Sequence, residues 1–236
     1  MLGKTTKEHW QAYWQTKDHQ PEVTHPELLK NLQAIIAVKG KKILEIGVGM
    51  GGDSLFLAGQ GAVVSVLDFS QEALARVRAS AQEKGLVVRT ILTDAQKIQV
   101  RDGFFDVVFH QGFLEHVEGP REYLLEQNRV LKKGGVLIVD VPQSFTTYTL
   151  KKHWQIFTDQ WFAGWETEFS VGQLERLVGS CGFEVVRSYG WGYYGKLQQV
   201  RCLRLGAWYE RFWRKIENSR LKLYLTFSIG VVAVKT

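Results

Sequence analysis

Short apolar runs alternate with longer segments of helical pattern between residues 42 and 141, and this alternation restricts the chain to one class of fold. Each run is rich in Val, Ile and Leu, which is typical of a strand buried on both faces of a sheet. The runs cover residues 43–46, 63–67, 87–92, 105–109 and 136–141, and two later runs cover 183–188 and 226–234. Strands that alternate with helices form parallel sheets covered on both faces. The pattern therefore predicts an α/β fold with a doubly wound, seven-stranded and mostly parallel sheet.

Capping residues indicate where the helices between these strands begin. Ser70 can cap the helix after the second strand, and Pro120 suits the first turn of a helix whose pattern continues to Lys133. Ser170 and Gln173 have the spacing of a capping box, which predicts a third helix start. In a sheet of this kind we expect the ligand site at the carboxyl ends of the strands.

The charge of the chain is uneven. The 236 residues carry 30 Lys and Arg against 24 Asp and Glu, a net charge of +6, yet residues 187–236 alone hold 10 basic and 2 acidic residues. The two cysteines form neither a disulfide framework nor part of a metal-binding cluster. The first residues lack the apolar run of a signal peptide, and the longest late uncharged stretch has 12 residues, too few to span a membrane. We expect a single cytoplasmic domain over residues 1–236 with no metal site.

A glycine-rich loop follows the first strand, with the sequence LEIGVGMGGDS over residues 44–54. Glycines let a backbone turn tightly and approach a ligand closely. Gly47, Gly49 and Gly52 also satisfy the dinucleotide-binding spacing, so an NAD(P)-dependent oxidoreductase fits the same letters. Glu45 places a carboxylate beside the loop, where it would repel a pyrophosphate and attract an amino group. Glu45 therefore favours a ligand that carries an amino group.

Two more carboxylates follow the next two strands. Asp68 closes the second strand, where a carboxylate can accept both hydroxyl groups of a ribose. Asp94 and Ala95 follow the third strand, where the carboxylate and a backbone N–H can read the edge of adenine. These positions favour a ligand that contains adenosine.

The loop with Glu45, Gly47, Gly49 and Gly51, followed by Asp68 and Asp94, resembles the class I S-adenosylmethionine-dependent methyltransferases. The resemblance continues through FDVVFHQGFLEHV at residues 105–117, which is similar to the fourth-strand motif of that family. It extends through RVLKKGGVL at residues 129–137, which is similar to its loop into the fifth strand. It covers about residues 40–190 and the last strand, and it is nearest to the small-molecule methyltransferases of quinone and secondary-metabolite pathways.

The resemblance implies a role for each matching residue. Gly47, Gly49 and Gly51 would cradle the methionine part of S-adenosylmethionine, and Glu45 would orient its amino group. Asp68 would bind the ribose and Phe69 would pack on the adenine. Asp94 and Ala95 would read the adenine edge, and the backbone around Gln111 would lie near the sulfonium. The resemblance also implies that the last strand is antiparallel and lies between the fifth and sixth strands.

The acceptor side of the reaction is less defined by the sequence. An oxygen or carbon nucleophile must lose a proton, and His is the natural base near neutral pH. His110 ends the fourth strand and His116 lies in the LEHV segment, so these two are the leading catalytic candidates, while His153, a third candidate, falls in the variable region after the fifth strand. A structural role is the alternative for each of them.

Segments outside the core are expected to hold the acceptor. Residues 1–39 predict an N-terminal helical cap with Trp10, Tyr13 and Trp14 on one helix face. Residues 143–169 predict a substrate lid, in which the expected acceptor contacts are Tyr148, Trp154 and Trp165. Such aromatic density indicates a bulky, partly apolar acceptor, although core packing explains it equally well.

A basic aromatic insert over residues 190–224 precedes the last strand. Its apolar residues follow helical spacing as a single stripe, formed by Leu205, Trp208, Tyr209, Phe212, Trp213 and Ile216. Arg204, Arg211, Arg214 and Lys215 lie off the stripe. An aromatic stripe with basic neighbours is typical of a helix that binds anionic lipid headgroups, and packing of the stripe on the protein itself is the alternative. Nucleic acid is a weaker interpretation of the same charges.

These observations predict an enzyme that transfers a methyl group from S-adenosylmethionine to oxygen or carbon of a small-molecule or lipid-like acceptor. The 205–216 helix would attach it peripherally to an anionic membrane. Two alternatives stay open: an NAD(P)-dependent oxidoreductase, and a non-catalytic module for cofactor binding or membrane recruitment.

Overall fold

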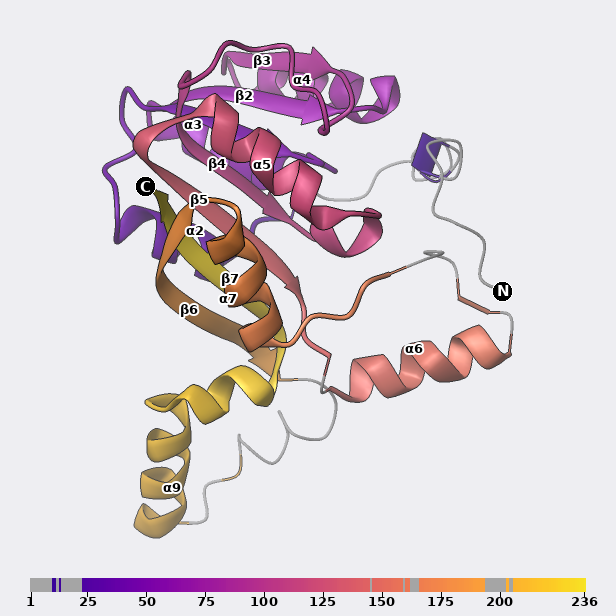
Figure 1. The fold of residues 1–236 in the computed structure, drawn as a ribbon, viewed down its shortest axis with the longest axis vertical. Helices are drawn as coiled ribbons and strands as arrows, with labels where there is room; N and C mark the ends of the chain where they lie inside the picture. The colour runs from indigo at the N-terminus through magenta and orange to yellow at the C-terminus, as the bar shows by residue number, and fades with distance from the viewer. Residues whose placement is uncertain are drawn as a thin grey trace.

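The computed structural model describes residues 10–11, 13, 23–144, 146–158, 160–161, 166–193, 203 and 206–236. Within these ranges the strands form one seven-stranded sheet in the order β3-β2-β1-β4-β5-β7-β6 (Figure 1). The strands are β1 (Lys42–Ile46), β2 (Val63–Asp68), β3 (Val88–Leu92), β4 (Phe105–Gln111), β5 (Leu131–Pro142), β6 (Phe183–Tyr193) and β7 (Thr226–Lys235). The α-helices are α2 (Pro26–Gln33), α3 (Gly52–Gly59), α4 (Gln71–Glu83), α5 (Pro120–Val130), α6 (Thr147–Phe157), α7 (Val171–Ser180) and α9 (Ala207–Glu217). Two short 3-10 helices are η1 (Leu114–His116) and η2 (Arg220–Tyr224).

The strand directions confirm the predicted sheet. β3, β2, β1, β4 and β5 run parallel to one another. β7 lies between β5 and β6 and is antiparallel to both. The last strand thus has the direction and the place that the sequence resemblance implied. The carboxyl ends of β1, β2 and β4 meet at one edge, where the glycine loop begins.

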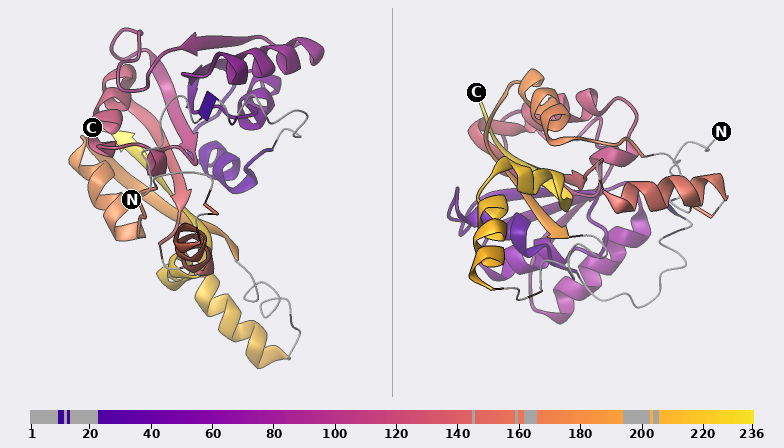
Figure 2. Two further views of the ribbon diagram at one scale, coloured as in Figure 1. Left: turned by 90° about the vertical axis from the view of Figure 1, so that its right-hand side faces the viewer. Right: turned by 90° about the horizontal axis from the view of Figure 1, so that it is seen from below.

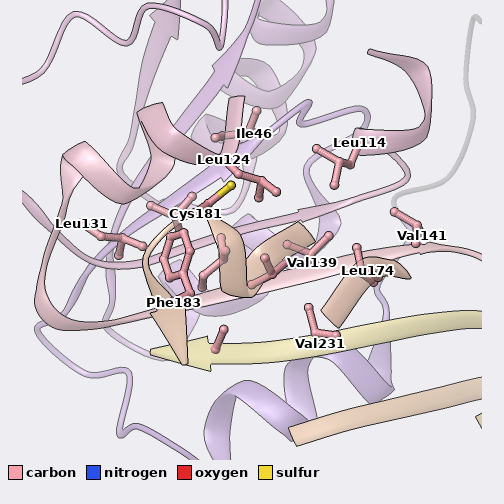
Figure 3. Packing of buried hydrophobic residues seen from close by; sticks show 14 of the residues in the cluster. Ile46, Leu114, Leu124, Leu131, Val139, Val141, Leu174, Cys181, Phe183 and Val231 are labelled. Carbon is pink, nitrogen blue, oxygen red and sulfur yellow. The ribbon is translucent and has the colours of Figure 1, made fainter. Parts of the chain in front are cut away.

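Two helical layers bury the two faces of the sheet. On one face, α5 and α7 pack on Leu44, Val108 and Val139, and Figure 3 shows the side chains of this layer around Leu124, Cys181 and Phe183. On the other face, α2, α3 and α4 pack on a second set of strand residues that includes Ile43, Val66 and Ile138. Each fully buried Leu, Ile or Val contributes roughly 1.5–3 kcal/mol relative to an exposed one. Burial on both faces explains why these strands read as continuous apolar runs.

The predicted caps are present at two helix starts. The Ser70 hydroxyl accepts the Ala73 N–H at the start of α4, at 3.2 Å. At the start of α7, the Ser170 hydroxyl accepts the Gln173 N–H and the Gln173 side chain accepts the Ser170 N–H, which completes the capping box. Each cap satisfies a backbone donor that a free helix end would leave unpaired.

The helix α5 is shorter than its sequence pattern. It begins at Pro120 as expected but ends at Val130 rather than Lys133. Leu131 adopts an extended backbone with φ −75° and ψ 142°, and it pairs with Phe105 as the first residue of β5. The apolar Leu131 suits a helix and a strand equally, and the sheet determines which one forms.

The expected lid, residues 143–169, leaves the sheet and returns to it at one point. Gln143 and Phe169 form an isolated parallel bridge, and the Ser144 N–H donates to the Phe169 carbonyl at 3.0 Å. The Gln143 N–H donates to the Phe227 carbonyl, which ties the same point to β7. Between these ends, α6 stands apart from the sheet beyond the carboxyl end of β5 (Figures 1 and 2).

The basic insert adds a second projecting helix. α9 extends from the lower end of β6 and β7, and η2 connects it back to the sheet (Figure 1). No helix in the part of the chain that the structure describes is both long and apolar enough to cross a bilayer.

A close contact between β7 and β6 provides a test of this packing. A Cβ atom on Gly230 would overlap the ring of Tyr189, whereas a Cβ on Gly59, at the exposed end of α3, would meet nothing within 4 Å. We expect Gly230→Ala to lower the free energy of unfolding by about 1–3 kcal/mol through overpacking. Gly59→Ala should be neutral or stabilising by about 0.5–1 kcal/mol. Urea unfolding of both variants measures this, and an equal loss in the two would contradict the packing.

Candidate active site

The glycine loop between β1 and α3 has a left-handed backbone at three positions. Gly47, Gly49 and Gly51 have φ values of +67°, +52° and +73°. Residues with a side chain rarely adopt such angles, so the turn itself requires glycine. The Gly47 N–H donates to the Leu67 carbonyl at 2.9 Å, which fixes the start of the loop to the end of β2.

Neighbouring segments approach the loop too closely for side chains. A Cβ on Gly51 would lie 2.7 Å from a methyl group of Val77 on α4. A Cβ on Gly52 would overlap the backbone carbonyl of Val23. Gly52 therefore allows the segment before α2 to cross the beginning of α3. The sequence suggested a close approach to a ligand, and the structure shows a close approach of the protein to itself as well.

His25 holds this crossing segment in place. Its backbone N–H donates to Oδ1 of Asp53 at 2.7 Å, and its Nδ1 lies 2.6 Å from Oδ2 of the same carboxylate. Burial of the imidazole opposes its protonation, but the hydrogen bond and charge of Asp53 outweigh it and raise the pKa of His25 above its usual value. The N-terminal segment is thus tied to the first turn of α3 by a charge-assisted pair.

A solvent-open cleft of about 470 Å³ lies at the carboxyl ends of β1 and β2. It brings together five of the residues predicted to bind a cofactor, which are Gly47, Asp68, Phe69, Asp94 and Ala95. The other lining residues are Ile46, Leu67, Thr93, Phe113, Val117 and Tyr123. The sequence interpretation missed these six, because most of them belong to apolar runs or to a helix that gives no polar signal.

Aromatic rings form one wall of the cleft. Phe113, in the loop after β4, contacts Tyr123 of α5 edge to face, with ring centroids 5.6 Å apart. Burial raises the pKa of Tyr123 to about 12, and the charges of Asp94 and Glu118 add to this effect. A flat, partly polar ring system such as adenine fits a wall of this kind, which offers ring edges and faces for stacking.

Carboxyl groups are buried around the cleft and the loop. Glu45, Asp53 and Asp68 are each less than a tenth exposed. Burial raises the pKa of Asp68 to about 6, although its carboxylate accepts the Ser70 N–H at 2.8 Å. Burial and the charge of Asp53 raise the pKa of Glu45 well above its ordinary value, and its Oε2 has no hydrogen-bond partner in the structure. Among the described residues, His25 pairs with Asp53 but no Lys or Arg pairs with Glu45 or Asp68, and acids gathered in this way favour a cationic ligand.

Asp140, on β5, adds a fourth buried carboxyl group, which the sequence did not suggest. Its Oδ2 accepts hydrogen bonds from Trp191 Nε1 at 2.8 Å and from the Tyr189 hydroxyl at 3.1 Å. Burial raises its pKa to about 7, and the positive charge of His25 lowers it. Asp140 pairs in register with Gln111 on β4, so the predicted sulfonium neighbour lies beside this acid.

The remaining predicted loop residues lie beside the cleft rather than in its lining. Glu45 is buried under the glycine loop, and Gly49 and Gly51 form the loop's turn. Gln111 is half-buried at the end of β4, on the same side of the sheet as Glu45. A ligand that extends from the cleft across the loop toward β4 would meet all of them.

The two histidine candidates differ in accessibility. His110 has no exposed surface, and burial lowers its pKa to about 3, so its imidazole is neutral. His116, on η1, is partly exposed, and its Nε2 lies 3.9 Å from Oε1 of Glu115. Its ring meets the ring of Trp10 edge to face, with centroids 4.9 Å apart, so this residue of the predicted N-terminal cap contacts the histidine. Of the two histidines, His116 is therefore the one that keeps some exposed surface.

The predicted acceptor contacts are only partly described. Trp165 and the side chain of Tyr148 lie outside the described residues, as do Trp14, Arg204 and Leu205 of the predicted cap and insert. Trp154 is described and is largely exposed on α6, away from the cleft lining. Among the described residues, no cluster of three His, Cys, Asp or Glu side chains has the arrangement of a metal site.

Known proteins share this arrangement of motifs. A family model described as a methyltransferase domain matches residues 44–139. The phosphatidylethanolamine N-methyltransferase of Cereibacter sphaeroides is 35% identical over 158 residues, covering 65% of this chain and 75% of that protein. The chain belongs to the class I S-adenosylmethionine-dependent methyltransferases. It is thus an enzyme that uses S-adenosylmethionine as its cofactor.

Two further similarities agree with this family. A ubiquinone biosynthesis O-methyltransferase of Cereibacter sphaeroides is 26% identical to this methyltransferase over 181 residues, covering 73% of this chain and 72% of the relative. The crystal structure of an S-adenosylmethionine-dependent methyltransferase from Mesorhizobium loti has the same fold, with a TM-score of 0.62 at 17% identity. That match covers 87% of this chain and 96% of the other.

The buried Asp68 makes the stability of the methyltransferase depend on pH. Its folded-state pKa of about 6 lies above the ordinary 3.8, so ionised Asp68 costs stability above pH 6 and this cost disappears as the pH falls toward 4. We expect Asp68→Asn to stabilise the cofactor-free protein near pH 8 by up to about 3 kcal/mol, with a gain that shrinks on acidification. Thermal unfolding across this pH range measures the gain, and a destabilised variant at high pH would contradict it.

Proposed function

We propose that this methyltransferase methylates oxygen or carbon of a lipid-like small molecule, with the cofactor held by the glycine loop and the aromatic cleft. The observation that carries the proposal is the meeting, at one sheet edge, of an apolar cleft with buried carboxyl groups, of which Glu45 and Asp68 have no ion-pair partner among the described residues. S-adenosylmethionine supplies a methyl group activated on a sulfonium cation, together with an ammonium group. A cationic, adenosine-containing molecule suits both halves of this site.

The residues divide the cofactor between them. Asp68 would accept the ribose hydroxyls, while Asp94 and Ala95 would read the adenine edge beside Phe69 and Phe113. Glu45 has a buried oxygen without a partner, which suits an ammonium group. Gly47, Gly49 and Gly51 would give the methionine part access to the loop backbone, and the backbone at Gln111 would border the reacting centre. A dinucleotide is disfavoured, because Glu45 and Asp53 would face its pyrophosphate.

His116 is the residue that we propose as the base. An oxygen or carbon acid loses its proton as the new bond forms, and the base must lie within hydrogen-bond reach of the acceptor. His116 borders the cleft residue Val117 in the chain and is partly exposed, whereas His110 is fully buried and its ring contacts Phe113. Glu115, whose pKa burial raises to about 8, lies beside His116 and would orient it.

The acceptor class is supported by the relatives and by the exposed aromatic helices. The two relatives named above carry the names of enzymes of ubiquinone biosynthesis and of phosphatidylethanolamine methylation. We extend to this chain a lipid-like acceptor that is taken from a membrane surface. The peripheral attachment predicted for the 205–216 helix belongs to this proposal.

The cofactor site is tested by replacing Asp68. We expect Asp68→Asn to weaken S-adenosylhomocysteine binding at least about tenfold, since a charged acceptor for hydroxyl groups is lost. Asp106→Asn is the matched control, because Asp106 lies at the opposite end of β4 and pairs with Lys132. Isothermal titration calorimetry measures both. Wild-type affinity in the Asp68 variant would refute the assignment, and the stability gain expected for the same variant excludes unfolding as the cause of weak binding.

The base is tested by kinetics with two probe acceptors, an alkylated catechol and phosphatidylethanolamine. We expect transfer to the catechol, and His116→Ala should lower kcat by about 100-fold to 10,000-fold without changing the affinity for the cofactor. His153→Ala on α6 is the control, because that imidazole is largely exposed and pairs with Glu168. Unchanged kcat in His116→Ala would remove His116 from the reaction. Transfer to small polar acceptors alone would overturn the proposed acceptor class.

A further inference from the structure

The helix α9 buries only part of its aromatic stripe. Tyr209, Trp213 and Ile216 pack against the protein, next to Leu225. Trp208 is 74% exposed, and its ring stacks on that of Phe212 with centroids 6.0 Å apart and an interplanar angle of 14°. The stripe, which is continuous in the sequence pattern, therefore has two sides in the structure. One side packs against the protein and holds the helix in place, and the other is exposed to solvent.

Charge is sorted around the same helix. At about 100° per residue, Arg211, Lys215 and Arg214 follow Trp208 and Phe212 around the exposed side. All three basic residues are exposed. Glu210 and Glu217 lie on the opposite side of the buried seam. An apolar edge bordered by a basic band is the arrangement with which interfacial helices meet anionic headgroups.

The helix α6 presents a second apolar stripe. Leu150, Trp154 and Phe157 follow i, i+4 and i+7 spacing, and they are 71%, 66% and 83% exposed. Solvent exposure of three large apolar side chains on one helix face is unfavourable, and such a face is typical of an interaction surface. The sequence interpretation placed Trp154 against the acceptor, but here it shares a stripe that faces away from the described part of the protein.

A buried lysine determines which side of α6 faces outward. Lys152 is on the face opposite the stripe, and its Nζ lies 3.0 Å from Oε1 of Glu168 and 3.3 Å from Oε2 of Glu166. The segment with these two glutamates runs above α6 in Figure 1, and the face of α6 that carries the stripe is the one opposite Lys152, away from that segment. α9 projects to that same side (Figures 1 and 2).

We propose that α6 and α9 together form a docking surface for an anionic phospholipid bilayer. Charge complementarity selects this occupant, because residues 187–236 carry 10 basic and 2 acidic residues and α9 displays its basic band beside the exposed rings. Attachment is by side chains that enter the interface rather than by a span. This membrane-docking inference rests on the proposed function in one respect only, which is that the acceptor is lipid-like. Such an acceptor would enter near the carboxyl end of β5, beside α6.

Vesicle sedimentation tests the surface without any methyl transfer. The full chain is mixed with phosphatidylcholine vesicles with and without phosphatidylglycerol, and we expect it to sediment with the anionic vesicles alone. Trp208→Ala with Phe212→Ala, and separately Leu150→Ala with Phe157→Ala, should each weaken binding about tenfold or more, since each pair removes two large side chains from the interface. Arg211→Glu should weaken it about fivefold or more.

Matched controls come from the opposite end of the sheet. Val87→Ala and Lys133→Glu alter an exposed apolar side chain and an exposed charge there, and both should sediment like the wild type. Wild-type unfolding midpoints in the helix variants would show that their folds are intact. Wild-type vesicle binding in the α6 variant would overturn the two-helix surface.

Other occupants give different results. Equal sedimentation with neutral vesicles, binding to poly(U) RNA in place of vesicles, or a dimer that the helix variants convert to a monomer would each overturn the bilayer as occupant. Failure of methyl transfer with intact vesicle binding would count against the proposed acceptor and not against this surface.

Discussion

At Gly51 and Gly52, the loop between β1 and α3 leaves no space for a side chain, and the rest of the site depends on that fit. Gly51 receives Val77 of α4, and Gly52 receives the backbone of Val23. The glycines that would let a ligand approach the loop backbone on one side thus let neighbouring parts of the protein approach it on the other. The His25 and Asp53 pair fastens the crossing segment, so the position of the N-terminal region is linked to the shape of the cofactor loop.

The buried acids around this loop lower the stability of the free protein but favour the binding of a cationic cofactor. Glu45, Asp68 and Asp140 are buried with raised pKa values, and each ionised carboxylate therefore costs the free protein some of its stability. A cationic cofactor reverses the sign of that cost, because its charge stabilises the ionised forms. At the proposed site, the cofactor would therefore bind where ionised carboxylates destabilise the free protein, and binding should stabilise the fold strongly.

The features that were predictable from the sequence are those that depend on local order along the chain. Asp68 and Asp94 end neighbouring parallel strands, so their meeting follows from the strand order alone. The role of Asp140 as a buried hydrogen-bond acceptor was not predictable, because it lies inside an apolar strand pattern. Its donors, Tyr189 and Trp191, come from β6. These contacts depend on how distant elements pack, which a single sequence does not specify.

The helices outside the core show the same limit. The stripe on α9 has clear helical periodicity, yet only the docked structure shows that Trp213 faces inward while Trp208 faces outward. The end of α5 was predicted three residues late, because Leu131 suits a helix and a strand alike and tertiary pairing with Phe105 decides the outcome. The cleft residues Phe113 and Tyr123 likewise look like ordinary apolar positions in the sequence.

The bridge between Gln143 and Phe169 has a consequence for how such enzymes diversify. Since the chain leaves and rejoins the sheet at one hydrogen-bonded point, the length and composition of the intervening segment are independent of strand register. Exchange of that segment between homologues would leave the cofactor half intact. Because the sequence predicts that this segment holds the acceptor, its exchange would change acceptor preference on a constant cofactor-binding half, by recombination as readily as by gradual substitution.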